Sequence, residues 1–184
     1  MHPEWDDLSA VVTPILDNAQ RVVIKVGSAV LTDGQGLGLD VVGSLASQIA
    51  LLHREGREVV LVSSGAVAAG RGVLSRLEGV GDIAGMAHRQ AASAVGQSRL
   101  MHAYDQAFSD AGVVSAQILL TRDDLKSRRR FLNARNTFSA LLDWRAVPIV
   151  NENDTVMVTE LEFGDNDQLA ALLLNLVEAD LYVN

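Results

Sequence analysis

The sequence predicts an α/β protein, a three-layer αβα sandwich with a mainly parallel central sheet. Short runs of aliphatic and β-branched residues alternate along the chain with longer stretches of helical periodicity. Hydrophobic residues make up 48% of the chain but aromatic residues only 4%, so Val, Leu, Ile and Ala must build the core. That mixture suits buried parallel strands covered by helices. The 184 residues are enough for one sizeable domain.

Five segments are predicted to be strands, because each is a short run of aliphatic and β-branched residues. The first covers residues 22–26 and ends at Gly27. A continuous apolar run of this kind is typical of a strand that is buried on both faces. The other four cover residues 59–62, 113–120, 148–150 and 181–183.

The segments between these strands show the periodicity of amphipathic helices. Asp40 is expected to cap a helix that Gly56 ends, because apolar residues recur at helical spacing between them. Thr121 and Asp124 have the spacing of a capping box in front of a short helix. Further helices are expected directly after residues 63–66 and over residues 83–111, 131–144 and 167–178, while residues 155–163 alternate like a hairpin.

Composition excludes several classes of function. The net charge is −8, which argues against general affinity for nucleic acid or for an anionic membrane surface. The sequence has no cysteine, so disulfides and thiolate metal sites are excluded. Its four histidines lack a metal-binding spacing. No apolar run reaches the roughly 18 residues of a membrane span, and the acidic start is unlike a signal peptide, so we expect a soluble, cytoplasmic protein.

Polar residues gather where the predicted strands end. In open α/β sheets, ligands bind beyond the carboxyl ends of the strands, which share one rim. Lys25 and Gly27 lie at the end of the first strand, Ser64 follows the second, and residues 151–154 follow the fourth. Residues 164–167 hang from the same rim through the expected hairpin. We therefore expect the chemistry of the protein at this rim.

Each of these features allows a structural and a functional interpretation. Lys25 either extends its ammonium from a strand end to solvent or holds a phosphate that approaches the bare backbone of Gly27. Ser64 either helps to cap the next helix or joins the N–H groups of that helix in binding a carboxylate or phosphate. Residues 151–154 and 165–167 form either a turn and a helix cap, or a cluster that binds cations and polar substrate groups.

Seven motifs follow one another along the chain from about residue 21 to its last residue. They cover residues 23–28, 62–70, 94–97, 119–122, 131–135, 151–154 and 164–167. In this order they resemble the motifs of the glutamate 5-kinases, which belong to the amino acid kinase superfamily. The Asn-Glu-Asn-Asp and Gly-Asp-Asn-Asp motifs separate this family from relatives such as acetylglutamate, carbamate and uridylate kinases.

The resemblance implies transfer of the γ-phosphoryl group of ATP to the side-chain carboxylate of L-glutamate, giving L-glutamyl 5-phosphate at the first step of proline biosynthesis. It implies that Lys25 holds the transferring phosphoryl group, that Lys25 and Gly27 contact the ATP phosphates, and that Asp165 and Asp167 orient the phosphate-binding lysines or the Mg²⁺-nucleotide. The acceptor carboxylate has a reference pKa of ~4.3, so it needs no general base at neutral pH. The remaining task is to position two anions and neutralise charge.

The same resemblance assigns the acceptor and the partners. Ser64, Asp154 and Asn166 would bind L-glutamate, with Asp154 suited to its α-ammonium group. Proline is implied as a feedback inhibitor that competes around the glutamate site. The family also associates as dimers or tetramers, so a homo-oligomer is expected.

The chain departs from the family in its extent. Residues 1–20 are interpreted as a lead-in, and residues 21–184 as the N-terminal part of an amino acid kinase domain. Family members continue after the fifth strand with a nucleotide-binding turn, a Gly-rich segment with a second catalytic lysine and often a PUA domain. We therefore expect a C-terminally truncated kinase that lacks most of its ATP and Mg²⁺ site. The alternative is a catalytically inactive module that binds glutamate or proline or pairs with another subunit; a third expectation is that the chain does not fold alone, because its sheet has lost partner strands.

Overall fold

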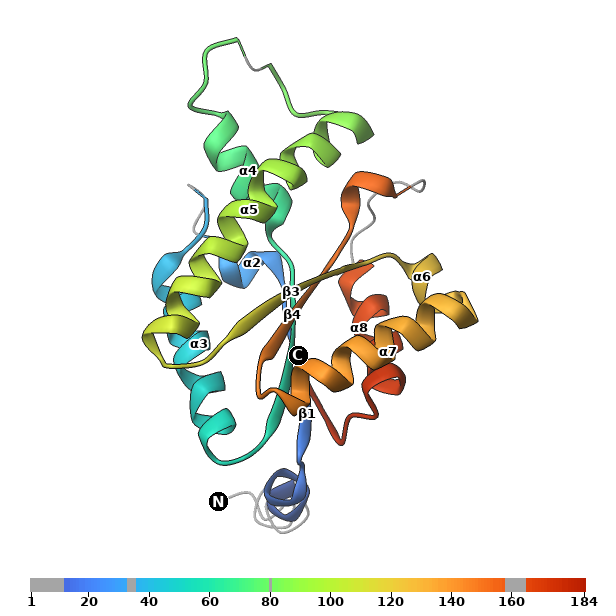
Figure 1. Cartoon of the computed structure of the whole chain (residues 1–184). Helices are drawn as coiled ribbons and strands as arrows, with labels where there is room; N and C mark the ends of the chain where they lie inside the picture. Colours follow the sequence, from blue (N-terminus) through green and yellow to red (C-terminus); the bar gives the residue numbers. More distant parts are fainter. Residues whose placement is uncertain (1–11, 33–35, 80, 158–164) are drawn as a thin grey trace, which may run out of the picture.

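The chain folds into three layers, with helices on both faces of one central sheet (Figure 1). The computed structural model describes residues 12–32, 36–79, 81–157 and 165–184, and all statements below concern these residues. Residues 12–18 are helical and lead into the sheet. This arrangement confirms the α/β sandwich predicted from the sequence.

The central sheet has five strands in the order β3-β4-β2-β1-β5, and every neighbouring pair is parallel. The strands are β1 (Arg21–Val26), β2 (Glu58–Ser63), β3 (Ser115–Leu120), β4 (Val147–Glu152) and β5 (Leu181–Val183). All five predicted strands are therefore present. Because the strands run in one direction, their carboxyl ends lie along a single rim of the sheet, as the sequence predicted.

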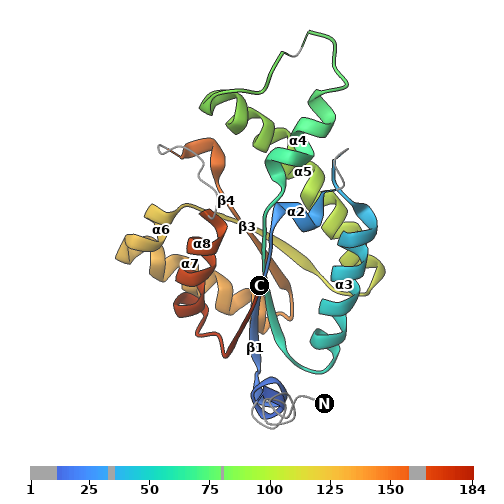
Figure 2. The same cartoon turned by 180° about the vertical axis from the view of Figure 1, so that it is seen from behind.

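One face of the sheet is covered by α3, α4 and α5, and the other by α6, α7 and α8 (Figures 1 and 2). Successive residues of β2 point into opposite cores. Val59 and Leu61 pack against residues of α3 and α5, whereas Val60 and Val62 pack against residues of α7 and α8. The helices are α2 (Ser28–Leu31), α3 (Leu39–Arg54), α4 (Ala66–Leu74), α5 (Met86–Asp110), α6 (Arg122–Lys126), α7 (Arg128–Asp143) and α8 (Asp165–Val177).

Two glycines let α4 and α5 cross in direct backbone contact. A Cβ on Gly96 of α5 would lie 1.7 Å from the carbonyl oxygen of Ala66. A Cβ on Gly70 of α4 would lie 1.8 Å from the carbonyl oxygen of Ala92. No side chain fits at either position, so this crossing fixes α5 relative to the start of α4, which lies at the rim.

Helix starts and turns were predicted with mixed success. Thr121 caps α6 with both hydrogen bonds of a capping box, as predicted. The predicted cap of α3 was wrong: Gly38 occupies that position and Asp40 lies in the first turn. The helix begins earlier because the Gly38 N–H donates to the Leu31 carbonyl at 2.8 Å, while the Gly38 carbonyl accepts from Val42 at 3.1 Å.

The turn that was one alternative for residues 151–154 begins only at Asp154. Asn151 and Glu152 are the last two residues of β4, because both pair with the end of β3. A 3₁₀ turn, Asp154–Val156, follows where the sequence predicted the start of a hairpin; the remainder of that hairpin, residues 158–163, lies outside the described residues. In the part of the chain that the structure describes, we find no helix that is both long and apolar enough to span a membrane.

Candidate active site

Lys25 and Asp167 form an ion pair at the rim. Lys25 lies near the end of β1, and its Nζ is 2.6 Å from Oδ1 of Asp167 at the start of α8. The lysine side chain is 13% exposed and the aspartate side chain 51% exposed. A largely buried ammonium needs a counter-charge, and Asp167 supplies it from the solvent side. The pair therefore holds a cation in place near the end of β1, beside the central strand β2.

Two neighbours define the surroundings of this pair. A Cβ placed on Gly27 would lie 3.8 Å from the Lys25 ammonium, so the backbone of Gly27 passes close beside it. Burial raises the pKa of Tyr182 in β5; the charge of Asp167 raises it further, and that of Lys25 lowers it. The Tyr182 hydroxyl therefore lies within electrostatic reach of both members of the pair.

Asn166 joins the carboxyl ends of β2 and β4. Its Nδ2 donates to Oγ of Ser64 at 2.6 Å and to Oδ1 of Asn151 at 3.1 Å, with a longer contact of 3.4 Å to the Ser63 carbonyl. Its Oδ1 is buried and has no hydrogen-bond partner among the described residues. A buried carbonyl oxygen without a donor is costly in a folded protein, so this oxygen is a natural acceptor for a ligand N–H group.

Asp154 places a carboxylate at the same rim. It begins the 3₁₀ turn after β4 and is 8% exposed, and its Oδ2 accepts a hydrogen bond from the hydroxyl of Ser93 in α5. The N–H of Asn153 donates to the Leu120 carbonyl at 2.9 Å, which ties this turn to the end of β3. The structure thus brings Lys25 to Asp167 and Ser64 to Asn166, with Asp154 on the adjoining turn.

Sequence reasoning missed the contribution of α5. Besides Ser93, this helix provides Gln97, whose Oε1 accepts from Nδ2 of Asn151 at 2.8 Å. It also provides Tyr104, whose hydroxyl lies 2.9 Å from Oγ of Ser63. Burial raises the pKa of Tyr104 to about 12, although the Ser63 hydrogen bond opposes the change, so the phenol stays neutral. The available signal was the helical spacing of these polar residues within an Ala-rich segment.

Asp165 is the first residue of α8, and the structure describes its backbone only. It therefore stands two positions before Asp167 at the same helix end. A carboxylate in the first turn of a helix interacts favourably with the helix dipole, so the acidic start of α8 is also a helix-starting signal.

The chain matches the model of the amino acid kinase family over residues 20–184. It belongs to this family. Related amino acid kinases are similar in sequence over almost all of the chain. One is the glutamate 5-kinase of Oleidesulfovibrio alaskensis, 71% identical over 170 residues, which are 92% of this chain and 44% of the relative. A second, from Nitratidesulfovibrio vulgaris, is 64% identical over 181 residues, 98% of this chain and 46% of the relative. A third, from Geobacter sulfurreducens, is 56% identical over 171 residues, 92% of this chain and 45% of the relative.

This amino acid kinase chain spans about half the length of the curated relatives it matches. The range matched by the family model, residues 20–184, contains all of the rim residues described above. Among the described residues, no group of three His, Asp or Glu side chains lies close enough to hold a metal ion. The described rim offers the Lys25 ammonium and amide groups to anionic and polar ligands.

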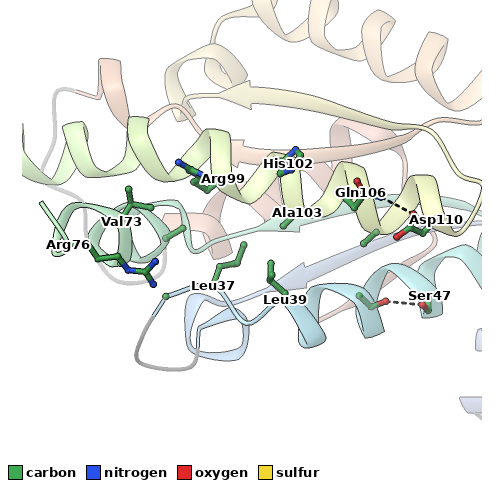
Figure 3. Close-up of a pocket in the computed structure, with 15 residues that line it drawn as sticks. Leu37, Leu39, Ser47, Val73, Arg76, Arg99, His102, Ala103, Gln106 and Asp110 are labelled. Atoms are coloured by element: carbon green, nitrogen blue, oxygen red, sulfur yellow. Dashed lines mark hydrogen bonds between the residues drawn. The ribbon is translucent and has the colours of Figure 1, made fainter.

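A hollow among the described residues of this chain lies away from the rim. It has a volume of about 760 Å³ and lies between α3, α4 and α5 (Figure 3). Leu37, Leu39 and Val73 line it together with the cations Arg76 and Arg99. None of the site residues predicted from the motifs contributes to its lining. The residues predicted from the motifs therefore gather at the rim and not in this hollow.

A smaller hollow of about 400 Å³ adjoins the rim beyond β3 and β4. It is lined by Glu152, which is 3% exposed, and by Arg122, whose Nε lies 3.7 Å from the Glu152 carboxylate. Asp124 also lines it; burial tends to raise the pKa of Asp124, but hydrogen bonds from Thr121 and Arg130 outweigh burial and lower that pKa. This hollow therefore carries both signs of charge.

Proposed function

We propose that the chain forms the acceptor-binding half of a glutamate 5-kinase, which phosphorylates the side-chain carboxylate of L-glutamate with ATP. The observation that carries the proposal is the joint placement of the Lys25–Asp167 pair and the Ser64–Asn166 contact on one rim. Relatives that share these segments at 56 to 71% identity are named glutamate 5-kinases, which supports the same assignment.

The acceptor fits the polar groups of the rim. We place the α-ammonium group of L-glutamate near Asp154, whose buried carboxylate suits a cation, and near the unpartnered Oδ1 of Asn166. Ser64 lies two residues before the start of α4, so the N–H groups and the positive dipole end of that helix are available to a carboxylate beside its hydroxyl.

The transfer step needs little from the protein beyond position and charge. An ionised carboxylate oxygen of glutamate attacks the γ-phosphorus of ATP, the bond from that phosphorus to the β,γ-bridging oxygen breaks, and ADP leaves. The Lys25 ammonium would stabilise the charge on the transferring group, and Asp167 would hold that ammonium in position through the ion pair. The small Gly27 would leave room for an ATP phosphate beside Lys25. Asp165 would act with Asp167 in orienting the phosphate-binding groups.

Mg²⁺ would arrive with ATP and neutralise its phosphates. We also propose proline as an inhibitor at the glutamate site, a homo-oligomer as the working assembly, and a cytoplasmic location. A non-catalytic module that binds glutamate or proline is the second candidate.

Calorimetry of the purified chain with L-glutamate, L-proline and Mg²⁺-ATP tests the proposal. We expect L-glutamate to bind, and Asn166→Ala to weaken binding about tenfold, because a buried hydrogen bond to a charged group contributes roughly 1.5–3 kcal/mol. The matched control is Asn136→Ala on the exposed surface of α7, which should leave affinity unchanged. Binding of glutamate or proline by a chain that neither binds nor turns over ATP would favour the non-catalytic module, whereas ATP turnover would exclude it. Absence of glutamate binding to the folded chain would contradict the proposal.

A further inference from the structure

One face of α5 carries a row of polar side chains in an otherwise Ala-rich helix. Gln90, Ser93, Gln97 and Tyr104 follow one another at spacings of three, four and seven residues, which places them on a single face. We call these four residues the α5 polar row. Ser93 and Tyr104 are buried, so the row faces the protein rather than solvent.

Each member of the α5 polar row makes a hydrogen bond to the rim. Gln90 donates to the Met157 carbonyl at 2.9 Å. Ser93 donates to the Asp154 carboxylate, and Gln97 accepts from Asn151 at 2.8 Å. The fourth contact joins Tyr104 to Ser63 at 2.9 Å. Four contacts from one helix face therefore span the segment from the end of β4 to residue 157 and reach the end of β2.

The hydrogen bond from Asn151 to Gln97 determines which way the Asn151 amide is turned, and therefore whether it presents its oxygen or its nitrogen to Asn166. Nδ2 of Asn151 is held by Gln97, so its Oδ1 faces the other way, where it accepts from the Glu152 N–H at 2.9 Å and from Asn166. Asn166 must then use Nδ2 toward Asn151 and Ser64, and this leaves its Oδ1 without a partner among the described residues. The acceptor character of the buried Asn166 oxygen thus traces back to the Gln97 carbonyl oxygen.

We propose that the α5 polar row positions the acceptor site: Ser93 orients the Asp154 carboxylate, and Gln97, through Asn151, turns the Asn166 carbonyl oxygen toward the ligand. This role rests on the proposed function, because it assigns these residues to the binding of the α-ammonium group of glutamate. Ser93 and Gln97 are positioning residues, since they act through Asp154 and Asn151 and need no contact with the substrate.

The crossing of α4 and α5 explains how the α5 polar row is held in a fixed position relative to the rim. Gly96 is the residue before Gln97 and lies against the backbone of Ala66 and Gly70. The position of Gln97 relative to Ser64 is therefore set by backbone contact, without an intervening flexible side chain. A site whose supporting residues are fixed by packing holds its ligand-binding groups within a narrow range of orientations.

The test compares Ser93→Ala and Gln97→Ala with matched controls on the exposed side of the same helix, Ser98→Ala and Gln106→Ala. Each protein is titrated with L-glutamate under conditions in which circular dichroism shows it to be folded. We expect both row variants to bind glutamate about tenfold more weakly than the wild type, and both controls to bind within twofold of it.

A second readout separates positioning from general stability and does not require glutamate. In ¹H–¹⁵N spectra, Gln97→Ala should shift the side-chain NH₂ signals of both Asn151 and Asn166, whereas Gln106→Ala should move neither. If these signals shift while the wild type binds no glutamate, the proposed function fails, and the role assigned to the row in glutamate binding fails with it. The hydrogen bonds that join Gln97, Asn151 and Asn166 would still be confirmed. If the wild type binds glutamate but the row variants bind within twofold of it, or if the two NH₂ signals stay in place, the positioning role is overturned.

Discussion

Replacing Gly96 by alanine should destabilise the fold more than any ordinary Gly→Ala change in a helix. The added Cβ would lie 1.7 Å from the Ala66 carbonyl oxygen and 2.4 Å from the Gly70 backbone nitrogen. Real Cβ contacts essentially never fall below 3.0 Å, so α5 must move by the difference between 3.0 and 1.7 Å, about 1.3 Å. Both obstacles are backbone atoms, and no side-chain rotation relieves the clash. Overpacking of this kind costs about 1–3 kcal/mol and occasionally more, and we expect about 3 kcal/mol.

Urea unfolding followed by circular dichroism measures this cost, and Gly43→Ala in α3 is the matched control. A Cβ on Gly43 meets no atom within 4 Å. Alanine is favoured over glycine in a helix interior, so this change should stabilise the protein by about 0.5–1 kcal/mol. If Gly96→Ala unfolds at the same urea concentration as the wild type, the close crossing of α4 and α5 is refuted, and with it the account of how Gln97 is placed.

Further predictions concern the rim and its supports. Tyr104→Phe should lower the free energy of unfolding by about 1 kcal/mol, because it removes the buried hydrogen bond to Ser63. Tyr182→Phe is its control and should change little, and an equal loss in both would contradict the account. Asp124 has a lowered pKa in the folded protein, so its contribution to stability is present above the ordinary carboxyl pKa of 3.8 and is lost as the pH falls through its lower folded-state pKa. Asp124→Asn should therefore flatten the acid side of a plot of unfolding free energy against pH, and an unchanged slope would show that the capping box does not bind the ionised form.

The fold could be predicted from the sequence because its strands are short runs of aliphatic and β-branched residues. Residues 59–62 are apolar on both faces, which is typical of a parallel strand between two helical layers. The end of β4 was harder. Asn151 and Glu152 have the composition of a turn, yet they pair with Leu119 and Leu120 as strand residues. The polar side chain of Asn151 is tolerated there because Gln97 and Asn166 satisfy its amide.

The site could be predicted in part for the same reason. Lys25, Ser64 and Asn166 belong to motifs that stand at strand or helix ends, so their placement on one rim follows from the topology of a parallel sheet. Ser93 and Gln97 lie inside a helix, where a polar residue is usually only solvated. Their contact with the rim depends on the orientation of α5 about its own axis relative to α4. That orientation is fixed by the backbone contacts of Gly70 and Gly96, which lie far apart in the sequence.

A structure determined with L-glutamate bound to the chain tests the central claim most directly. We predict ligand density at the rim, with the α-ammonium group near Asp154 and the Asn166 Oδ1, and the side-chain carboxylate directed toward Lys25. Ligand density in the hollow of about 760 Å³ between α3, α4 and α5, with an empty rim, would contradict it.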